Sequence, residues 1–153
     1  VAPITSSCPS SALRATSQGA RTQEGVATTG VRALCDVARN VDDEQLDVIG
    51  ATGGVVHITA VSSFVRSRAR PDAVTVADFV NHIDYAVDRI GIRHVGISSD
   101  FDGGGGFKGW HDASDSPNIT AELVRRGYGP DDIALLWSGN FLRLLRIAEQ
   151  AAG

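Results

Sequence analysis

Residues 55–61 read VVHITAV and residues 94–99 read HVGISS, and both are short apolar runs that contain β-branched residues. Continuous runs of this kind are typical of strands that are buried on both faces of a parallel sheet. Between them, residues 75–90 repeat apolar side chains at helical spacing, so the connection is too long for a hairpin. The sequence therefore predicts an α/β fold in which parallel strands alternate with helices.

Capping signals place helices around these two strands. The acidic start of residues 42–49 predicts one helix, and a shorter helical repeat is indicated at residues 31–35. Thr75 and Asp78 have the spacing of a capping box, which opens a helix that Gly91 ends. Two strands alone cannot close a barrel, so these signals predict a small, open sheet.

The last third of the chain is predicted to be helical. Helices are indicated at residues 119–126 and 130–137, followed by a break at Gly139 and a final helix capped by Asn140. The final helix is predicted to bury an apolar face that comprises Leu142, Leu145, Ile147 and Ala148.

The first thirty residues have a different character. They are rich in Ser, Thr, Ala, Arg and Gly and show neither a helical nor a strand period, so they offer no face to bury. We expect residues 1–29 to be unstructured and residues 30–153 to form the folded part. An out-of-frame reading of GC-rich coding DNA would have a similar composition. A truncated or frameshifted start of this sequence is therefore a further hypothesis.

Composition narrows the class of protein. The 153 residues, 42% of them hydrophobic, suffice for one domain or part of one, and the formal net charge of -4 with scattered Lys and Arg argues against nucleic acid as a partner. No apolar run approaches the roughly 18 to 20 residues that span a bilayer, and no leader pattern opens the chain. We therefore expect no membrane segment and a cytoplasmic location by default.

Two aspartates are the best-placed candidates for chemistry. Asp100 and Asp102 directly follow the predicted strand at residues 94–99 and precede four glycines. In α/β barrels the reacting groups lie at the carboxyl ends of the strands, which favours a catalytic role. The alternative, that the aspartates cap a turn that the glycines permit, is equally compatible with the sequence.

Other polar residues are open to two interpretations. Arg39 lies in a short turn, where its guanidinium could bind a carboxylate through two hydrogen bonds or could simply be solvated. His57 interrupts an apolar strand and is interpreted as a hydrogen-bonded core histidine, because no second histidine stands at metal-ligand spacing. The group at residues 111–115 has possible metal ligands but is interpreted as a solvated turn.

Four blocks of sequence carry a resemblance to a known family. They read VRALCDVARNVDDEQLDVIGATGGVV at residues 31–56, HVGISSDFDG at 94–103, the segment 117–127, and LLWSGNFLRLL at 135–145. In this order they resemble consecutive blocks of the membrane (renal) dipeptidases. The resemblance implies the last two strands and C-terminal helices of a partial (β/α)8 TIM barrel of the metal-dependent hydrolase type, with two zinc ions that activate a water to hydrolyse a dipeptide substrate. Members of this family often dimerise.

The resemblance also implies roles for single residues. Arg39 takes the role of binding the free carboxylate of the dipeptide, and Asp100 takes a catalytic acidic role near the metals. The last histidine ligand of the family would fall at Thr28, and the other ligands would lie upstream, so no metal ligand is assigned and we expect this chain not to retain zinc. A non-catalytic truncated α/β protein, or a small binding module, remains the alternative function.

Overall fold

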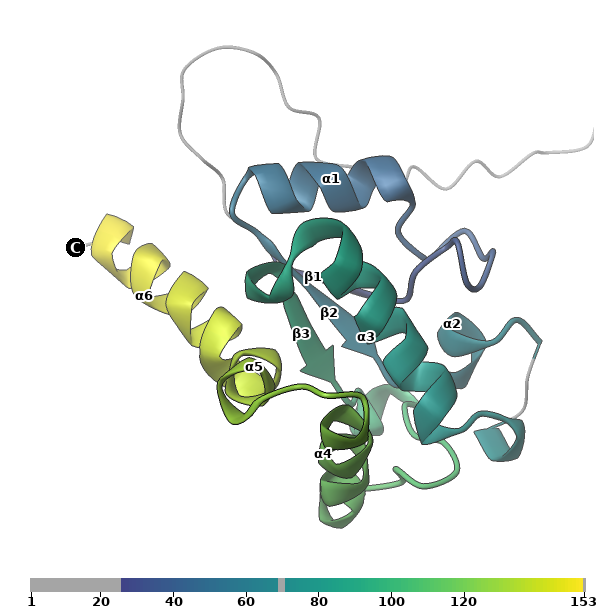
Figure 1. Cartoon of the computed structure of the whole chain (residues 1–153). Helices are drawn as coiled ribbons and strands as arrows, with labels where there is room; N and C mark the ends of the chain where they lie inside the picture. Colours follow the sequence, from purple (N-terminus) through teal and green to yellow (C-terminus); the bar gives the residue numbers. More distant parts are fainter. Residues whose placement is uncertain (1–25, 69–70, 153) are drawn as a thin grey trace, which may run out of the picture.

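Three parallel strands form the sheet of the computed structural model, which describes residues 26–68 and 71–152. Strands β1 (Val26–Thr29), β2 (Val55–Thr59) and β3 (Val95–Ser98) lie side by side in chain order (Figure 1). In their register Thr28 pairs with His57, and His57 pairs with Gly96. The prediction of an α/β fold with parallel strands is confirmed.

Strand β1 corrects the prediction that residues 1–29 are unstructured. Val26–Thr29 pair with β2 along their whole length, whereas residues 1–25 lie outside the described residues. The strand was missed because it lies at the edge of the sheet and buries only Thr29, while Val26 is 46% exposed. Main-chain pairing rather than a hydrophobic period holds it in place.

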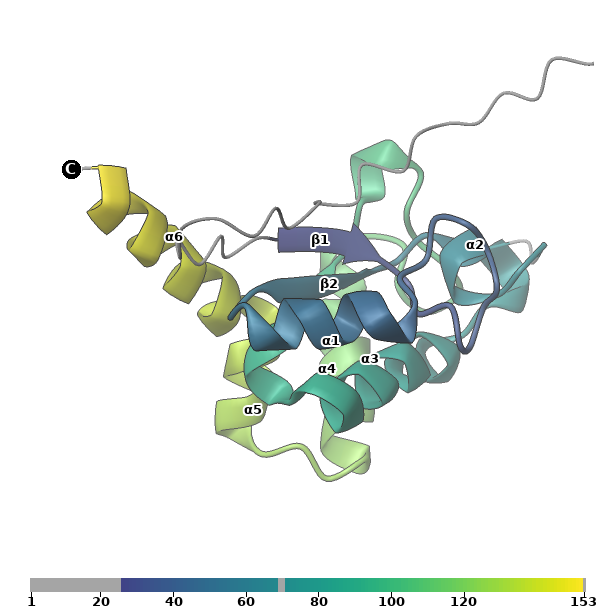
Figure 2. The same cartoon turned by 90° about the horizontal axis from the view of Figure 1, so that it is seen from above.

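Two helices cover one face of the sheet. Helices α1 (Asp43–Ala51) and α3 (Val76–Ile90) lie on the same side of the strands (Figure 2). Each begins with a capping box, at Asp42 in α1 and at Thr75 in α3, and Gly91 ends α3 with a positive φ of 87°. The core between the sheet and these helices comprises Leu46, Val56, Ile58, Phe79, Val80, Ile83, Val95 and Ile97.

The opposite face of the sheet is less well covered. Val26 and Thr28 are exposed on it, and His57 and Ser98 are half-buried. The ring of Phe141 meets the imidazole of His57 edge to face at 5.9 Å between centroids. Parallel sheets are normally covered on both faces, so this face is available to further structure.

The segment between β1 and α1 is a loop and not the helix that was predicted at residues 31–35. Val31 and Cys35 are buried, and the amide of Cys35 donates to the carbonyl of Val31 at 3.0 Å, which closes a single turn. The turn does not continue because the amide of Arg32 donates instead to the carbonyl of Val41 at 2.8 Å. The helical spacing reflected one turn of a returning loop.

The C-terminal third contains α4 (Ser116–Arg125), α5 (Pro130–Ala134), a π-helical turn at Leu135–Gly139 and α6 (Asn140–Ala152). The predicted break at Gly139 is wrong, because the helix passes through the π-turn into α6. Asn140 is not a cap: its buried side chain donates to the carbonyls of Ile92 and Val95, at 2.7 and 2.8 Å. The remaining short elements are α2 (Ser62–Val65) and the 3-10 turns Pro71–Ala73, Ile92–His94, Phe101–Gly103 and Ala113–Asp115.

The apolar face predicted for the last helix is largely exposed. Leu142, Leu145 and Ile147 are each about two-fifths exposed, at 40%, 42% and 39%. Asn140 and Leu144, on another face of α6, are the buried residues that turn toward the sheet. Within residues 26–68 and 71–152, no helix has both the length and the apolar character needed to cross a bilayer.

Candidate functional site

The carboxyl ends of the three strands bring three loops to one edge of the sheet. Residues 30–42 follow β1, residues 60–65 follow β2, and residues 99–106 follow β3. The amide of Gly106 donates to the carbonyl of Ala60 at 2.7 Å, which ties the second and third loops together. In α/β proteins this edge is where ligands bind, so it is the candidate site.

Asp100, the second residue of the loop after β3, has an unusual backbone conformation. It is one of two non-glycine residues with positive φ in the described part of the chain, with φ 54° and ψ 32°. Its carbonyl accepts from the amides of Gly103 and Gly105 at 3.0 and 2.7 Å, so the main chain builds the turn. This left-handed conformation costs about 1 to 2 kcal/mol for a residue with a Cβ, and such strain gathers at functional sites.

The Asp100 carboxylate is left free by this turn. The side chain is exposed and makes no hydrogen bond or ion pair with any other described residue. It lies over Gly103, where an added Cβ would come within 2.5 Å of Oδ1. The sequence allowed the interpretation that the aspartates cap a turn that the glycines permit. The glycines do permit this turn, but the Asp100 carboxylate does not cap it.

Arg39 lies on the loop after β1 with its guanidinium unpaired. Its Cζ is 5.9 Å from the centroid of the Phe64 ring, and no carboxylate among the described residues forms an ion pair with it. Its carbonyl oxygen accepts from Thr29 Oγ1 at 2.9 Å, which fixes its main chain. By contrast, Arg32 on the same loop pairs with Asp42 at 3.3 Å. The Arg39 guanidinium is thus a cation available to a ligand, resting on an aromatic face.

The structure brings Arg39 and Asp100 to the same edge of the sheet, with β2 between their strands. Neighbouring strands are about 4.8 Å apart, so the ends of β1 and β3 are separated by roughly 10 Å.

Other residues singled out in the sequence lie away from this edge or serve local structure. The imidazole of His57 packs against Gly96, where an added Cβ would lie 2.7 Å from Nε2, and burial lowers the pKa of His57. Asp115 accepts from the amide of His111 at 2.9 Å, and Asp112 from the amide of Ser114 at 2.8 Å. The interpretation of residues 111–115 as a turn therefore agrees with their hydrogen bonds.

Two buried polar residues near the site, Asn40 and His82, were given no functional role from the sequence. His82 stands on the inward stripe of α3 beside Ile83, so a polar residue in an apolar helical repeat was the signal that could have found it. Asn40 directly follows Arg39, and only its burial distinguishes it from a solvated turn residue.

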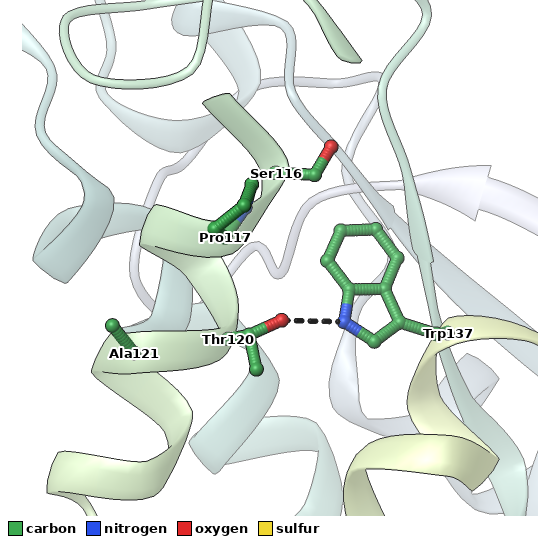
Figure 3. Close-up of a pocket in the computed structure, with 5 residues that line it drawn as sticks. All are labelled: Ser116, Pro117, Thr120, Ala121 and Trp137. Atoms are coloured by element: carbon green, nitrogen blue, oxygen red, sulfur yellow. Dashed lines mark hydrogen bonds between the residues drawn. The ribbon is translucent and has the colours of Figure 1, made fainter. Parts of the chain in front are cut away.

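An apolar pocket lies beside the aromatic cluster that adjoins the site. It has a volume of about 610 Å³ and is lined by four residues of α4, Ser116, Pro117, Thr120 and Ala121, together with Trp137 (Figure 3). The indole nitrogen of Trp137 donates to Thr120 Oγ1 at 3.0 Å. The Trp137 ring packs on Trp110, which in turn packs on Phe101 in the loop after β3. The pocket lacks titratable side chains, so it offers an apolar surface and no catalytic group.

Acidification should destabilise the fold in a pH window to which His82 and the half-buried His57 both contribute, because burial lowers the pKa of each. Burial lowers the pKa of His82, so the unfolded chain takes up its proton near pH 6.5 while the folded chain resists it. The contribution of neutral His82 to the free energy of unfolding is complete above about pH 6.5. It is lost as the pH falls toward the lowered pKa of the folded state, by at most about 1.4 kcal/mol per pH unit.

Urea unfolding between pH 7.5 and 5 measures this loss of unfolding free energy, and His82→Gln should reduce its slope with pH to the part that His57 contributes. The series should stay above pH 5, because Arg125 and Arg126 lower the pKa of Glu122 to about 2 and its contribution is lost only as the pH falls below the ordinary range of a glutamate. A slope that is unchanged in His82→Gln would contradict the assignment.

Comparisons with known proteins agree with the sequence resemblance. Residues 25–153 match the family model described as Membrane dipeptidase (Peptidase family M19). The chain is 40% identical over 121 residues to Dipeptidase aclJ of Aspergillus oryzae, covering 78% of this chain and 28% of that protein. It is 34% identical over 123 residues to Dipeptidase 3 of Rattus norvegicus, covering 80% of this chain and 25% of that protein.

Solved structures of two bacterial proteins have a similar fold. The probable dipeptidase PvdM from Pseudomonas aeruginosa matches with a TM-score of 0.72 and 33% identity, over 77% of this chain and 43% of that chain. A metallo peptidase from Rhodobacter sphaeroides, liganded with a phosphinate mimic of the dipeptide L-Ala-D-Ala, matches with a TM-score of 0.75 and 31% identity, over 79% of this chain and 35% of that chain. This chain thus spans less than half the length of each of these relatives.

Proposed function

The chain belongs to the membrane dipeptidase family, and we propose that it supplies the carboxylate-binding side of a metal-dependent dipeptidase site. The proposal places β1, β2 and β3 as consecutive strands in the wall of a (β/α)8 barrel. Helices α1 and α3 would then lie outside the wall, and the row Thr28, His57 and Gly96 would face the interior. The open face of this parallel sheet supports that placement, because barrel strands are covered on both sides.

The observation that carries the function is the pair of unpaired, opposite charges at one edge of the sheet. The Arg39 guanidinium presents a planar fork of donors that matches a carboxylate, and in a dipeptide the free carboxylate lies only one residue from the scissile bond. The free Asp100 carboxylate can accept a proton during attack on the peptide bond and return it to the leaving amine. Arg39 would therefore orient the substrate, and Asp100 would move the proton.

A metal pair, zinc by the family resemblance, would supply an activated water to this reaction when bound. Among residues 26–68 and 71–152, no three His, Cys, Asp or Glu side chains lie close enough together to hold a metal ion. Thr28 occupies the place proposed for a histidine ligand, and the loop after β3 offers only the carboxylates of Asp100 and Asp102. The described residues do not by themselves fit such a centre, so no catalytic step is assigned to a metal.

A graft tests the proposed function. Residues 30–153 of this chain should replace the matching C-terminal part of Dipeptidase aclJ of Aspergillus oryzae and leave a protein that hydrolyses dipeptides. Folding of the graft is checked by circular dichroism, and its metal content by elemental analysis. A folded, metal-loaded graft without dipeptide hydrolysis would show that these residues do not form the carboxylate-binding side of the site.

A second graft, joined at residue 26, isolates the effect of Thr28 and bears on the non-catalytic alternative. A threonine is a poor zinc ligand, so this graft should hold less zinc than the first one, and Thr28→His should restore the metal. Equal zinc content in both grafts would show that the position has no part in metal binding.

A further inference from the structure

Asn40 bridges the loop after β1 to helix α2. The ladder between β1 and β2 ends at the pair of Thr29 and Ile58, and the two chains then separate. The amide of Gly30 donates to Asn40 Oδ1 at 3.0 Å, and Asn40 Nδ2 donates to the carbonyl of Phe64 at 2.8 Å. Nδ2 also donates to the carbonyl of Cys35 at 2.8 Å, so both amide hydrogens of the 1% exposed Asn40 are used.

His82, from helix α3, makes a second bridge between the same two segments. Its Nδ1 accepts from the amide of Val31 at 3.0 Å, and its Nε2 lies 3.0 Å from the carbonyl of Val65. An amide only donates and a carbonyl only accepts, so the ring must be neutral with its proton on Nε2. The side chain is 2% exposed and reaches the two loops from the outer helical layer.

The two side chains act as a pair, which we call the double bridge. They connect two consecutive residues after β1, Gly30 and Val31, to two consecutive residues in α2, Phe64 and Val65. The double bridge thus continues the pairing of these segments after the main-chain ladder has ended. The fit is tight, because a Cβ added at Gly30 would come within 2.5 Å of the Phe64 carbonyl oxygen.

We propose that Asn40 and His82 are positioning residues that hold the Arg39 guanidinium in place for the substrate carboxylate. Arg39 precedes Asn40, and its guanidinium rests on Phe64, whose carbonyl the double bridge fixes. An arginine that is already ordered loses less side-chain entropy when it binds a carboxylate. The substrate part of this inference rests on the proposed function, whereas the ordering of Arg39 does not.

NMR spectroscopy of the whole 153-residue chain tests the ordering directly. In the native chain His82 should show the Nε2-protonated tautomer, and the side-chain protons of Arg39 should carry a ring-current shift from Phe64. In Asn40→Leu the amide of Gly30 should exchange with solvent at least roughly tenfold faster, and in His82→Phe the amide of Val31 should do so. Both variants should lose the ring-current shift of Arg39.

The matched control is Asn140→Leu. Asn140 is equally buried and also donates to two main-chain carbonyls, but those carbonyls are at the opposite, amino-terminal end of β3. This variant should lose stability without changing the Arg39 signals. Phe64→Leu, which keeps both bridges, should release Arg39 while leaving the amides of Gly30 and Val31 protected. Because Phe64→Leu keeps both bridges, it tests the contact between Arg39 and Phe64 even if Asn40→Leu or His82→Phe fails to fold.

Titration with L-alanyl-L-alanine and with its C-terminal amide separates this inference from the proposed function. The native chain should bind the free acid more tightly, and Arg39→Ala should abolish the preference. If the native chain shows no preference, the proposed function fails while the NMR results on Arg39 still stand. If the preference depends on Arg39 but Asn40→Leu and His82→Phe leave it and the Arg39 signals unchanged, the double bridge has no positioning role.

Discussion

Replacing Asp100 by Asn should lower kcat for dipeptide hydrolysis by roughly a hundredfold or more in the graft that carries residues 30–153. Asparagine has nearly the same shape as aspartate and tolerates a left-handed backbone, so the turn at φ 54° should survive. What is lost is the ability to accept a proton. Steady-state kinetics measures the change, and elemental analysis checks that the metal content is unaltered.

The control for this prediction is Asp102→Asn in the same graft. Asp102 is exposed and lies two residues further along the same loop. Its replacement by Asn removes the same charge as Asp100→Asn does. Its kcat should stay close to that of the unmodified graft. Wild-type turnover in Asp100→Asn would show that the Asp100 carboxylate takes no part in the reaction, and the catalytic assignment would then be wrong.

The sequence predicted the elements whose local signals agree with their surroundings. Strands β2 and β3 are buried along most of their length, and α3 carries a capping box, an apolar stripe and a terminal glycine that all indicate the same helix. The local sequence signals of strand β1, and those that would define the buried face of α6, do not agree with their surroundings in this way. Main-chain pairing holds β1, and the anchoring of Asn140 to β3 determines which face of α6 turns inward.

The candidate site was predictable in part for a related reason. Asp100 and Arg39 lie in loops at strand ends, and their sequence blocks resemble a family in which those positions have roles. Asn40 gave no comparable signal, and His82 gave only its place in the apolar stripe of α3, because the importance of both depends on contacts with segments 24 and 51 residues away. A buried polar residue that bridges two loops is recognisable only when both of its partners are in place.

Replacing Arg39 by Ala should raise KM for dipeptides by about 10- to 150-fold in the same graft, with a smaller change in kcat. The loss of a charge-assisted pair of hydrogen bonds costs on the order of 1.5 to 3 kcal/mol, and a clamp on a non-reacting carboxylate acts on the bound substrate and the transition state alike. The KM of Arg39→Lys should lie between those of the unmodified graft and Arg39→Ala, because lysine keeps the charge but lacks the planar fork of donors.

Two comparisons tie this effect to the substrate carboxylate. A dipeptide with a C-terminal amide should already be a poor substrate of the unmodified graft and should lose little more in Arg39→Ala. Arg32→Ala removes an arginine from the same loop, but one whose charge is already paired with Asp42 at 3.3 Å. It should leave KM nearly unchanged. If Arg39→Ala raised KM equally for the free acid and for the amide, Arg39 would not bind the substrate carboxylate. Its role would then be to maintain the structure of the loop after β1.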